Sequence, residues 1–446
     1  MKSAPDPDAL HAAHLAEISA RTARALEACQ FETLWIHAGS ERRAFLDDQT
    51  YPFRPNPHFS WWVPLTEAPQ SLLRIQPGRR PLLLFHCPQD YWHLPPQLPD
   101  AAWIQGFEVR AVADWAETLA ALPAPDARTA VLGEPTPELE SLAPATLNPP
   151  RLLRWLHEQR VRKTPYELAC QQEATRLGVA AHLSARAAQE AGESEYGIHQ
   201  AFLAGCGQRE SELPYRAIVA RGSHGATLHY QALDRGRPPA PTSLLIDAGA
   251  SFRGYGSDIT RTWPACPDDE FSALVAGLDR VQRGLCERVK AGTDWPGLHL
   301  RAHHEIATLL KEAGVIRTSP ESAVETGLSS VFLPHGLGHL LGLQVHDVAG
   351  FHADPERPPM PPPPEHPALR LTRRLEAGMA VTMEPGIYFI DVLLDEARRN
   401  PHAASIDWKA VERLRPHGGV RIEDNLVVTP DGSENLTRQA FAAAEA

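Results

Sequence analysis

Carboxylates that interrupt apolar, strand-like segments are the feature that most restricts how this chain can fold. Asp247 closes the apolar run "LLID", Glu384 follows "AVTM", and Glu423 stands within "GVRIEDNLVV". An ionised carboxylate is costly to bury unless it is paired with a counter-charge or coordinates a cation. Three separate strands with this pattern therefore predict that their acidic residues are paired or metal-bound.

The segment "LLIDAGASFRGYGSDITRTW", residues 244–263, places a second acid, Asp258, in the same region as Asp247. Its ends read as strands, and Arg253-Gly254 suits a tight turn, so we predict a hairpin. Side chains alternate between the two faces of a strand, so a two-residue turn places both aspartates on one face. A three-residue turn would place them on opposite faces. Taken alone, such a pair can equally be solvated turn residues.

Histidines occur among glycines in "PHGLGHLLGLQVHD", which contains His335, His339 and His346. Four carboxylates and one imidazole are too many ligands for one cation and would nearly neutralise two divalent cations. Their oxygen-rich ligation suits Mn²⁺ or Co²⁺ better than a thiolate-rich site would. Another segment, "RAHHEIATLL", contains His303 and His304 but lacks the H-E-x-x-H pattern, so we interpret it as a helix face.

Hydrophobic patterning divides the 446 residues into two regions. Apolar runs at 33–39, 81–86 and 129–134 alternate with helical spacing, which predicts an α/β domain. In the second region helices come first and glycine-punctuated strands later, which predicts an α+β domain. We therefore expect an N-terminal domain over residues 1–160 and a second domain over residues 161–446.

Capping chemistry predicts where two long helices begin and end. Thr164, Pro165 and Glu167 form the pattern of a capping box at a helix start. A second helix has one apolar stripe over residues 271–289, and Gly292 suits its C-terminal cap.

Composition excludes several classes of protein. The formal net charge of −12 argues against a nucleic-acid groove, because phosphate binding needs Lys and Arg in excess. No apolar run approaches the ~20 residues of a membrane span, and the start lacks a signal-peptide core. Six scattered cysteines without a C-x-x-C pair are interpreted as buried free thiols. We expect a cytoplasmic, soluble protein whose proline-rich segment 354–367 is a surface loop.

The ordered motifs "D-x-G…SDITRTW", "PHGLGH…GLQVHD", "MEPGIY" and "GVRIEDN" resemble those of the pita-bread metallopeptidases, in particular the bacterial prolidases (Xaa-Pro dipeptidases). The resemblance extends to "FLDDQTYPFRPNPHFSWWVPL", "RKTPYEL" and "HPALRLTRRLEAGM". It implies an α/β N-terminal domain and an α+β pita-bread (creatinase/aminopeptidase-like) catalytic domain. It also implies five ligands of a dinuclear metal centre: Asp258 and Glu423 bridging both ions, His339 and Glu384 on one ion, and Asp247 on the other.

By the same resemblance, the substrate is an Xaa-Pro dipeptide and the cofactors are two divalent metal ions per subunit. Mn²⁺ is expected, with Co²⁺ or Zn²⁺ as alternatives. A hydroxide held between the ions would attack the peptide carbonyl carbon. Glu384 would take the second proton of the water and deliver it to the proline nitrogen, which cannot leave until it is protonated.

Other residues match positions that line the substrate pocket in this family. His346 would hydrogen-bond the substrate or the tetrahedral intermediate, and His335 and His229 would lie in the same pocket. Arg370 would pair bidentately with the proline carboxylate, which would restrict substrates to dipeptides. Two residues beside the ligands would orient the carboxylates: Arg421 and Tyr388.

Alternative functions remain open at this point. An enzyme similar to aminopeptidase P would cleave Xaa-Pro from longer peptides, but the "HPALR" context of Arg370 and the long segment between His339 and Glu384 favour a dipeptidase. Hydrolysis of organophosphate esters is a side activity that close relatives suggest. A non-catalytic binding module is disfavoured, because all five ligands are intact. The family also implies a homodimer.

Overall fold

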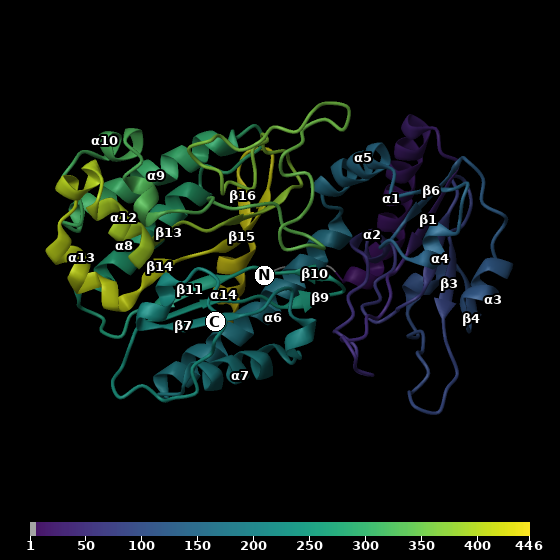
Figure 1. Cartoon of the computed structure of the whole chain (residues 1–446), viewed down its shortest axis with the longest axis horizontal. Coiled ribbons are helices and arrows are strands. Elements are labelled where there is room, and N and C mark those ends of the chain that lie inside the picture. The colour runs from purple at the N-terminus through teal and green to yellow at the C-terminus, as the bar shows by residue number, and fades with distance from the viewer. Residues whose placement is uncertain (1–5) are drawn as a thin grey trace. The chain divides into compact units, whose positions relative to one another are not determined.

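The computed structural model describes residues 6–446, and the chain divides into two compact units (Figure 1). The first comprises the chain up to Cys170 with Asp354–Glu356, and the second comprises Gln171–Ala353 with Arg357–Ala446. The domain boundary expected after residue 160 stays a prediction. All six cysteines are free thiols, as expected, but only Cys170, Cys206 and Cys286 are buried, and Cys266 is exposed. Within residues 6–446, no helix is both long and apolar enough to cross a membrane.

The N-terminal unit is built on a six-stranded sheet in the order β4-β3-β2-β1-β5-β6. The three strands predicted from apolar runs are confirmed as β1, β3 and β5, but the sequence pattern did not reveal β2 or β4. β4 is an edge strand whose side chains are mostly exposed, so it has no apolar run to detect. The strands are Thr33–His37 (β1), Leu72–Ile75 (β2), Leu82–His86 (β3), Glu108–Val112 (β4), Thr129–Leu132 (β5) and Thr146–Leu147 (β6).

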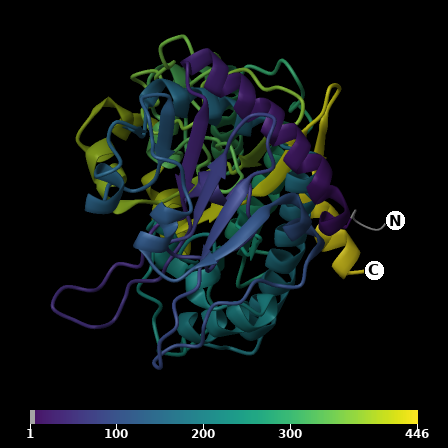
Figure 2. The same cartoon turned by 90° about the vertical axis from the view of Figure 1, so that its right-hand side faces the viewer.

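Helix α1, Pro7–Cys29, is the longest helix that lies wholly in this unit, and Figure 2 shows it in purple beside the strands. The Asp6 side chain caps its start by accepting a hydrogen bond from the Asp8 backbone N–H, 3.0 Å away. α1 packs against α5, Pro150–Val161. The shorter helices are α2 (Pro57–Ser60), η1 (Ala102–Gly106), α3 (Trp115–Ala120) and α4 (Pro137–Glu140).

The second unit contains short antiparallel sheets, with the orders β11-β8-β7, β12-β15-β16, β13-β14 and β10-β9. An isolated bridge between Thr260 and Glu423 connects the first two of these regions, and a bridge between Leu340 and Val381 brings the glycine-rich histidine segment to β12. The strands are Ile218–Arg221 (β7), Leu244–Asp247 (β8), Ser251–Phe252 (β9), Tyr255–Gly256 (β10), Thr260–Trp263 (β11), Ala380–Met383 (β12), Gly386–Tyr388 (β13), Gly419–Arg421 (β14), Asp424–Val428 (β15) and Ser433–Asn435 (β16).

Helices cover these strands on two sides (Figure 1). α6 and α7 share a hydrophobic cluster with β7 and β8, whereas α8 and α9 share another with β13 and β14. The helices are α6 (Pro165–Glu190), α7 (Glu195–Cys206), α8 (Glu270–Cys286), α9 (Trp295–Glu312), α10 (Pro320–Glu325), α11 (Ser329–Phe332), α12 (Asp391–Arg398), α13 (Trp408–Leu414) and α14 (Leu436–Ala444). Single 3₁₀ turns are η2 (Glu210–Glu212), η3 (Gly222–Ala226), η4 (Pro401–Ser405) and η5 (Arg415–His417). The proline-rich segment 354–367 contains neither helix nor strand, as expected.

The predicted capping box at the start of α6 is confirmed. The Thr164 backbone N–H donates to Glu167 Oε2 at 2.9 Å, and the Glu167 N–H donates to Thr164 Oγ1 at 3.4 Å. The predicted end of α8 at Gly292 is wrong, because the helix ends at Cys286. Beyond it the backbone N–H of Gly292 bonds to the Leu375 carbonyl, so contacts with a distant segment replace the last helical turn.

The predicted hairpin is confirmed, with a two-residue turn. Phe252 pairs with Tyr255, so only Arg253 and Gly254 form the turn, and both have positive φ, 51° and 86°. Such angles are typical of the type I′ turn that suits the strand twist. The same register continues to the pairing of Asp247 with Thr260, which places Asp258 on the face that Asp247 occupies.

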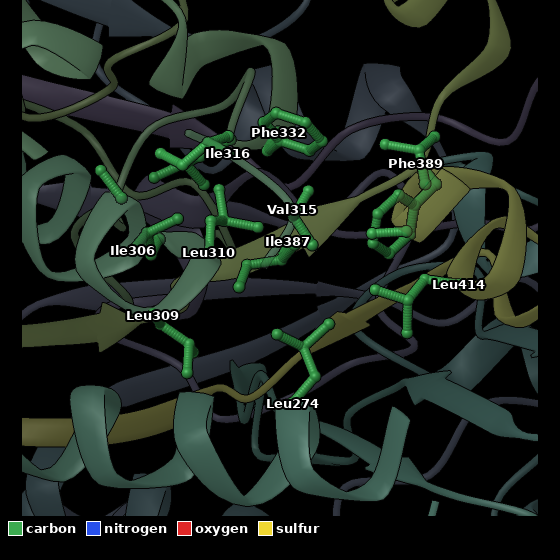
Figure 3. Packing of buried hydrophobic residues seen from close by; sticks show 14 of the residues in the cluster. Leu274, Ile306, Leu309, Leu310, Val315, Ile316, Phe332, Ile387, Phe389 and Leu414 are labelled. Carbon is green, nitrogen blue, oxygen red and sulfur yellow. The ribbon is translucent and has the colours of Figure 1, made fainter. Parts of the chain in front are cut away.

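The core beside these strands fixes their position. Figure 3 shows Leu274 from α8, Ile306 and Leu310 from α9, and Ile387 from β13 in one buried cluster. Each of these side chains is at most 1% exposed. Burial of a leucine or isoleucine side chain contributes about 1.5–3 kcal/mol, so this cluster holds β13 and β14 rigidly next to the acidic residues.

Candidate metal centre and active site

The predicted ligands come together at the ends of the strands of the second unit. Ligand atoms of Asp258, His339 and Glu423 all lie within 4.8 Å of one another. His339 Nε2 is 3.5 Å from Asp258 Oδ2 and 3.4 Å from Glu384 Oε1. Tyr215 Oη reaches both Asp258 and Asp247, so all five predicted ligands belong to one cluster.

The backbone interrupts its strands where the ligands occur. The run "AVTMEPGIYF" forms β12 and β13, separated by Glu384 and Pro385, and "GVRIEDNLVV" forms β14 and β15, separated by Ile422 and Glu423. Glu423 is therefore between strands rather than inside one, which corrects the sequence-based expectation. The Glu423 N–H still donates to the Thr260 carbonyl, at 3.0 Å, so the interruption keeps the carboxylate beside β11.

Close backbone approach explains one glycine of the hairpin. A Cβ at Gly249 would lie 1.8 Å from the carbonyl oxygen of Ser257 on the opposite chain segment. Any side chain there would push the two segments apart. Because Gly249 and Ser257 lie between Asp247 and Asp258 in the paired structure, this contact controls the separation of the two carboxylates.

The tautomer of His339 is set by its surroundings. Its Nδ1 donates a hydrogen bond to the Leu340 carbonyl at 2.9 Å, which leaves the Nε2 lone pair directed at the carboxylates. Its backbone N–H donates to Thr382 Oγ1 at 3.0 Å, which ties the residue to β12. This is the arrangement that metal-ligating histidines require, because the second nitrogen is held by a hydrogen-bond acceptor.

Burial and mutual repulsion disfavour the ionised forms of the carboxylates in this cluster. Burial, and the negative charge of neighbouring carboxylates, raise the pKa of Asp258, Glu384 and Glu423 well above the usual values. Arg421 opposes these shifts. One guanidinium cannot balance four carboxylates, whereas divalent cations can. The donor set therefore fits bound divalent metal ions, although the metal identity does not follow from it.

Sequence comparison assigns this arrangement to a family. Residues 9–157 match the family described as "Xaa-Pro dipeptidase, N-terminal domain", and residues 169–430 match "Metallopeptidase family M24". The chain belongs to metallopeptidase family M24. It is a hydrolase, and it has the α/β N-terminal domain and pita-bread catalytic domain that the resemblance implied.

Related sequences and solved structures extend over the full chain. The Xaa-Pro dipeptidase of Xanthomonas axonopodis pv. citri (strain 306) is 48% identical over 441 residues, 99% of each chain. That of Stenotrophomonas maltophilia (strain K279a) is 46% identical over 439 residues, 98% of this chain and 99% of the relative. Proline aminopeptidase P II from Yersinia pestis has a TM-score of 0.71 at 25% identity, covering 96% of both chains. Aminopeptidase P from E. coli with the inhibitor Pro-Leu has a TM-score of 0.72 at 24% identity, covering 97% and 99%, which shows a shared fold.

Tyr215 is a residue of this M24 centre that the sequence did not reveal. Its Oη lies 2.7 Å from Asp247 Oδ1 and 2.5 Å from Asp258 Oδ1. Burial and the two aspartates raise its pKa well above the usual value, so the phenol keeps its proton and can donate to either carboxylate. Tyr215 precedes β7, far from the recognisable motifs, so only β7–β8 pairing brings it to the aspartates.

A chain of hydrogen bonds connects one ligand to the pocket histidines. Arg421 donates from Nη2 to Asp247 Oδ2 at 2.7 Å and from Nη1 to Tyr388 Oη at 2.7 Å. Tyr388 Oη lies 2.8 Å from His335 Nε2. The predicted orienting residues therefore contact a ligand, directly through Arg421 and indirectly through Tyr388.

His335 is partly buried beside the acidic cluster, in its neutral form. Its Nδ1 donates to the Gly336 carbonyl at 2.8 Å and lies 3.6 Å from Glu384 Oε2. Burial, and then the positive charge of Arg421, lower its pKa to about 4. Its Nε2 consequently accepts the hydrogen bond from Tyr388.

His346 packs against the predicted ligand His339, and it is exposed, as are the other two pocket residues. Its ring centroid is 4.4 Å from that of His339, and burial, His339 and Arg370 lower its pKa to about 3. His229 lies in an exposed turn after η3. Arg370 is exposed in a loop.

Glu195 anchors the segment that carries His229, and the sequence contained no signal for it. This carboxylate, 1% exposed at the start of α7, accepts hydrogen bonds from His224 Nδ1, Tyr230 Oη and the Asp234 backbone N–H, each at 2.7 Å. These contacts fix the segment on both sides of His229. Its role depends on residues about 30–40 positions away, which the local pattern cannot reveal.

Proposed function

We propose that this chain hydrolyses Xaa-Pro dipeptides at the cluster of Asp247, Asp258, His339, Glu384 and Glu423. The observation that carries the proposal is the convergence of these ligands in a chain related over its full length to Xaa-Pro dipeptidases. The relatives indicate the substrate, and the buried donor set indicates metal-assisted hydrolysis. A dinuclear centre is the arrangement that balances four carboxylates.

Two divalent ions, with Mn²⁺ preferred and Co²⁺ or Zn²⁺ as alternatives, would polarise the peptide carbonyl and lower the pKa of a shared water. Asp258 and Glu423, whose ligand atoms lie within 4.8 Å of each other, would hold both ions. Thr260 Oγ1 donates to Glu423 Oε2 at 2.7 Å, so one oxygen of this carboxylate is oriented by the protein. A zinc-substituted E. coli aminopeptidase P in complex with product (TM-score 0.72, 24% identity, covering 96% and 98%) has the same fold.

Proton transfer is assigned to Glu384. Its carboxylate lies at the edge of the cluster, 3.4 Å from His339 Nε2, and its environment raises its pKa. A carboxyl group with a raised pKa can accept a proton from water and donate it again within one catalytic cycle. The proline nitrogen must receive that proton, because it leaves as an amine.

The pocket side chains would bind and orient the dipeptide. His346 is neutral and packs against His339, so its N–H can donate a hydrogen bond to the substrate carbonyl or the tetrahedral oxyanion. His229, on its anchored turn, would contact the same group from the other side. Both ring nitrogens of His335 are already hydrogen-bonded, so this residue would line the pocket and position Tyr388. Arg370 would pair with the free proline carboxylate, which would exclude peptides that continue beyond proline.

The experiment that tests this proposal compares Ala-Pro with Ala-Pro-Ala on metal-stripped protein resupplied with Mn²⁺. We expect cleavage of the dipeptide alone. Cleavage of the tripeptide would support the alternative suggested by the solved structural neighbours, an aminopeptidase P-like activity. No cleavage of either peptide would contradict the catalytic proposal.

Arg370 can be tested separately against a matched arginine. We expect Arg370→Ala to raise KM for Ala-Pro about 10- to 100-fold, because hydrogen bonds to a charged group contribute about 1.5–3 kcal/mol. Arg374→Ala is the control, since this exposed arginine lies 3.9 Å from Asp294 in a surface pair. Equal KM values for the two variants would remove Arg370 from substrate binding.

Several finer expectations stay predictions. Homodimerisation and a cytoplasmic location rest on the family resemblance and on composition. Hydrolysis of organophosphate esters would use the same metal ions and water, and no feature of the site favours it over peptide hydrolysis. The domain boundary at residues 160–161 is likewise a prediction.

A further inference from the structure

A second group of potential metal ligands lies outside the acidic cluster. His299 and His303 on α9 and His366 from the proline-rich loop have ligand nitrogens that all lie within 4.8 Å of one another. The Nε2 atoms of His299 and His303 are 3.2 Å apart, and the three ring centroids are 4.5–4.6 Å apart. Two nitrogens bound to one ion at about 2.0–2.1 Å would have this separation.

The helix provides two of these ligands at the spacing that metal sites use. His299 and His303 are four residues apart and therefore project from one face of α9. His303 Nδ1 lies 2.9 Å from Ser329 Oγ, and a hydrogen bond donated there leaves the Nε2 lone pair facing His299 Nε2, which can donate to it when no ion is bound. Metal-ligating histidines are held in this way through their second nitrogen. Within residues 6–446, His299 Nδ1 has no hydrogen-bond partner.

The environment keeps these imidazoles in the form that binds metals. His299 and His303 are 1% and 0% exposed, and His366 is half-buried at the open side. Burial and the neighbouring histidines lower the pKa of His299 to about 2 and that of His303 to about 3. Both rings are therefore neutral at pH 7 and do not have to lose a proton to bind an ion.

We propose that His299, His303 and His366 form a second metal site that holds one ion and is selective for Zn²⁺ or another imidazole-binding ion over Mn²⁺. Its donors are three neutral nitrogens, whereas the acidic cluster offers four carboxylates and one imidazole. Three histidines leave further coordination positions for water on the exposed side at His366. A bound ion would tie the loop that leads to Arg370, four residues after His366, to α9.

The neighbouring His304 marks the boundary of this site. It lies on the other face of α9 and is 3.1 Å from Glu321 Oε1 at the surface. The interpretation of "RAHHEIATLL" as a helix face holds for His304, whereas His303 belongs to the buried group. His304 therefore offers a control substitution on the same helix that leaves the three ligands intact.

The alternative to a metal site is a buried hydrogen-bonded histidine group, and the metal content of untagged protein distinguishes the two. Metal-stripped full-length protein would be equilibrated with excess Mn²⁺ and with a series of Zn²⁺ concentrations from limiting to saturating. After desalting, the metal content per chain would be measured by mass spectrometry. We expect His366→Gln to bind about one Zn²⁺ fewer per chain than wild type, and His304→Gln to match wild type. Equal zinc content in all three proteins would overturn the proposal.

A second measurement identifies the ligand type. In Cu²⁺-loaded protein, pulsed electron paramagnetic resonance should show a three-imidazole signal that is present in His304→Gln and lost in His366→Gln. Because His366 is partly exposed, its substitution should preserve folding, which circular dichroism would check. An identical spectrum in both variants would contradict the site. Neither readout depends on peptide hydrolysis, so the proposed dipeptidase activity can fail while this site stands.

Discussion

Tyr215 and Arg421 show how single residues control the acidic cluster. Each contacts Asp247, and Tyr215 also reaches Asp258, so these two side chains hold carboxylates that would otherwise repel one another. Oriented carboxylates bind metal ions with less loss of conformational entropy. Residues that hold ligands in this way typically affect metal affinity or activity by about 10- to 100-fold.

We therefore expect Tyr215→Phe to weaken Mn²⁺ binding and dipeptide turnover by about 10- to 100-fold without unfolding the protein. The measurement is activity as a function of free Mn²⁺, together with metal content. Tyr196→Phe is the control, because Tyr196 is 36% exposed and stacks with Arg235 at the surface. Unchanged Mn²⁺ affinity in Tyr215→Phe would show that the hydrogen bonds are dispensable.

Glu384→Gln tests the proton-transfer assignment. The amide is nearly isosteric but cannot shuttle a proton, so we expect kcat to fall by about 10²- to 10⁴-fold or more. Metal content has to be measured in parallel, since Glu384 is also a proposed ligand. Near-normal turnover at full metal occupancy would remove Glu384 from this role.

At the scale of elements, features that depend on adjacent residues could be predicted from the local sequence, and features that depend on distant contacts could not. The capping box of α6 and the two-residue hairpin turn depend on adjacent residues, and both are confirmed. The end of α8 and the interruption at Glu423 were mispredicted, because bonds from Gly292 to Leu375 and from Glu423 to Thr260 override local preference.

The close contact at Gly249 gives a prediction for the hairpin. A methyl group at this position would clash with the Ser257 carbonyl, so Gly249→Ala should destabilise the protein by more than about 3 kcal/mol and lower metal affinity. Gly284→Ala is the control: it lies in α8 with no atom near its Cβ, and we expect about 0.5–1 kcal/mol of stabilisation. Urea unfolding of both variants provides the test, and equal stability would refute the steric argument.

At the scale of the whole molecule, the acidic cluster couples folding to metal and pH. The pKa values of Asp258, Glu384 and Glu423 are raised in the folded chain without metal. Their protonated forms therefore stabilise that chain below the unfolded pKa of about 4, and this stability is lost as pH rises through the folded pKa values. Bound cations remove the repulsion among the ionised carboxylates.

We accordingly expect the increase in Tm on adding Mn²⁺ to be larger at pH 8 than at pH 5. A ligand at a hundred times its Kd stabilises by about 2.7 kcal/mol, which is measurable by calorimetry. Comparing each pH with and without Mn²⁺ cancels the titration of groups elsewhere in the chain. An increase that is the same at both pH values, or smaller at pH 8, would contradict this coupling.

The acidic residues of the cluster could be anticipated from local pattern, because a carboxylate that interrupts an apolar strand is unusual, whereas the full set of predicted ligands and the choice of His339 among three histidines rested on the family resemblance. Capping and turn geometry were equally readable, since they depend on residues within a few positions. Tyr215, Glu195 and the group of His299, His303 and His366 could not be recognised in that way. Their partners are distant in sequence, and only packing of the strands and helices brings the atoms within bonding distance.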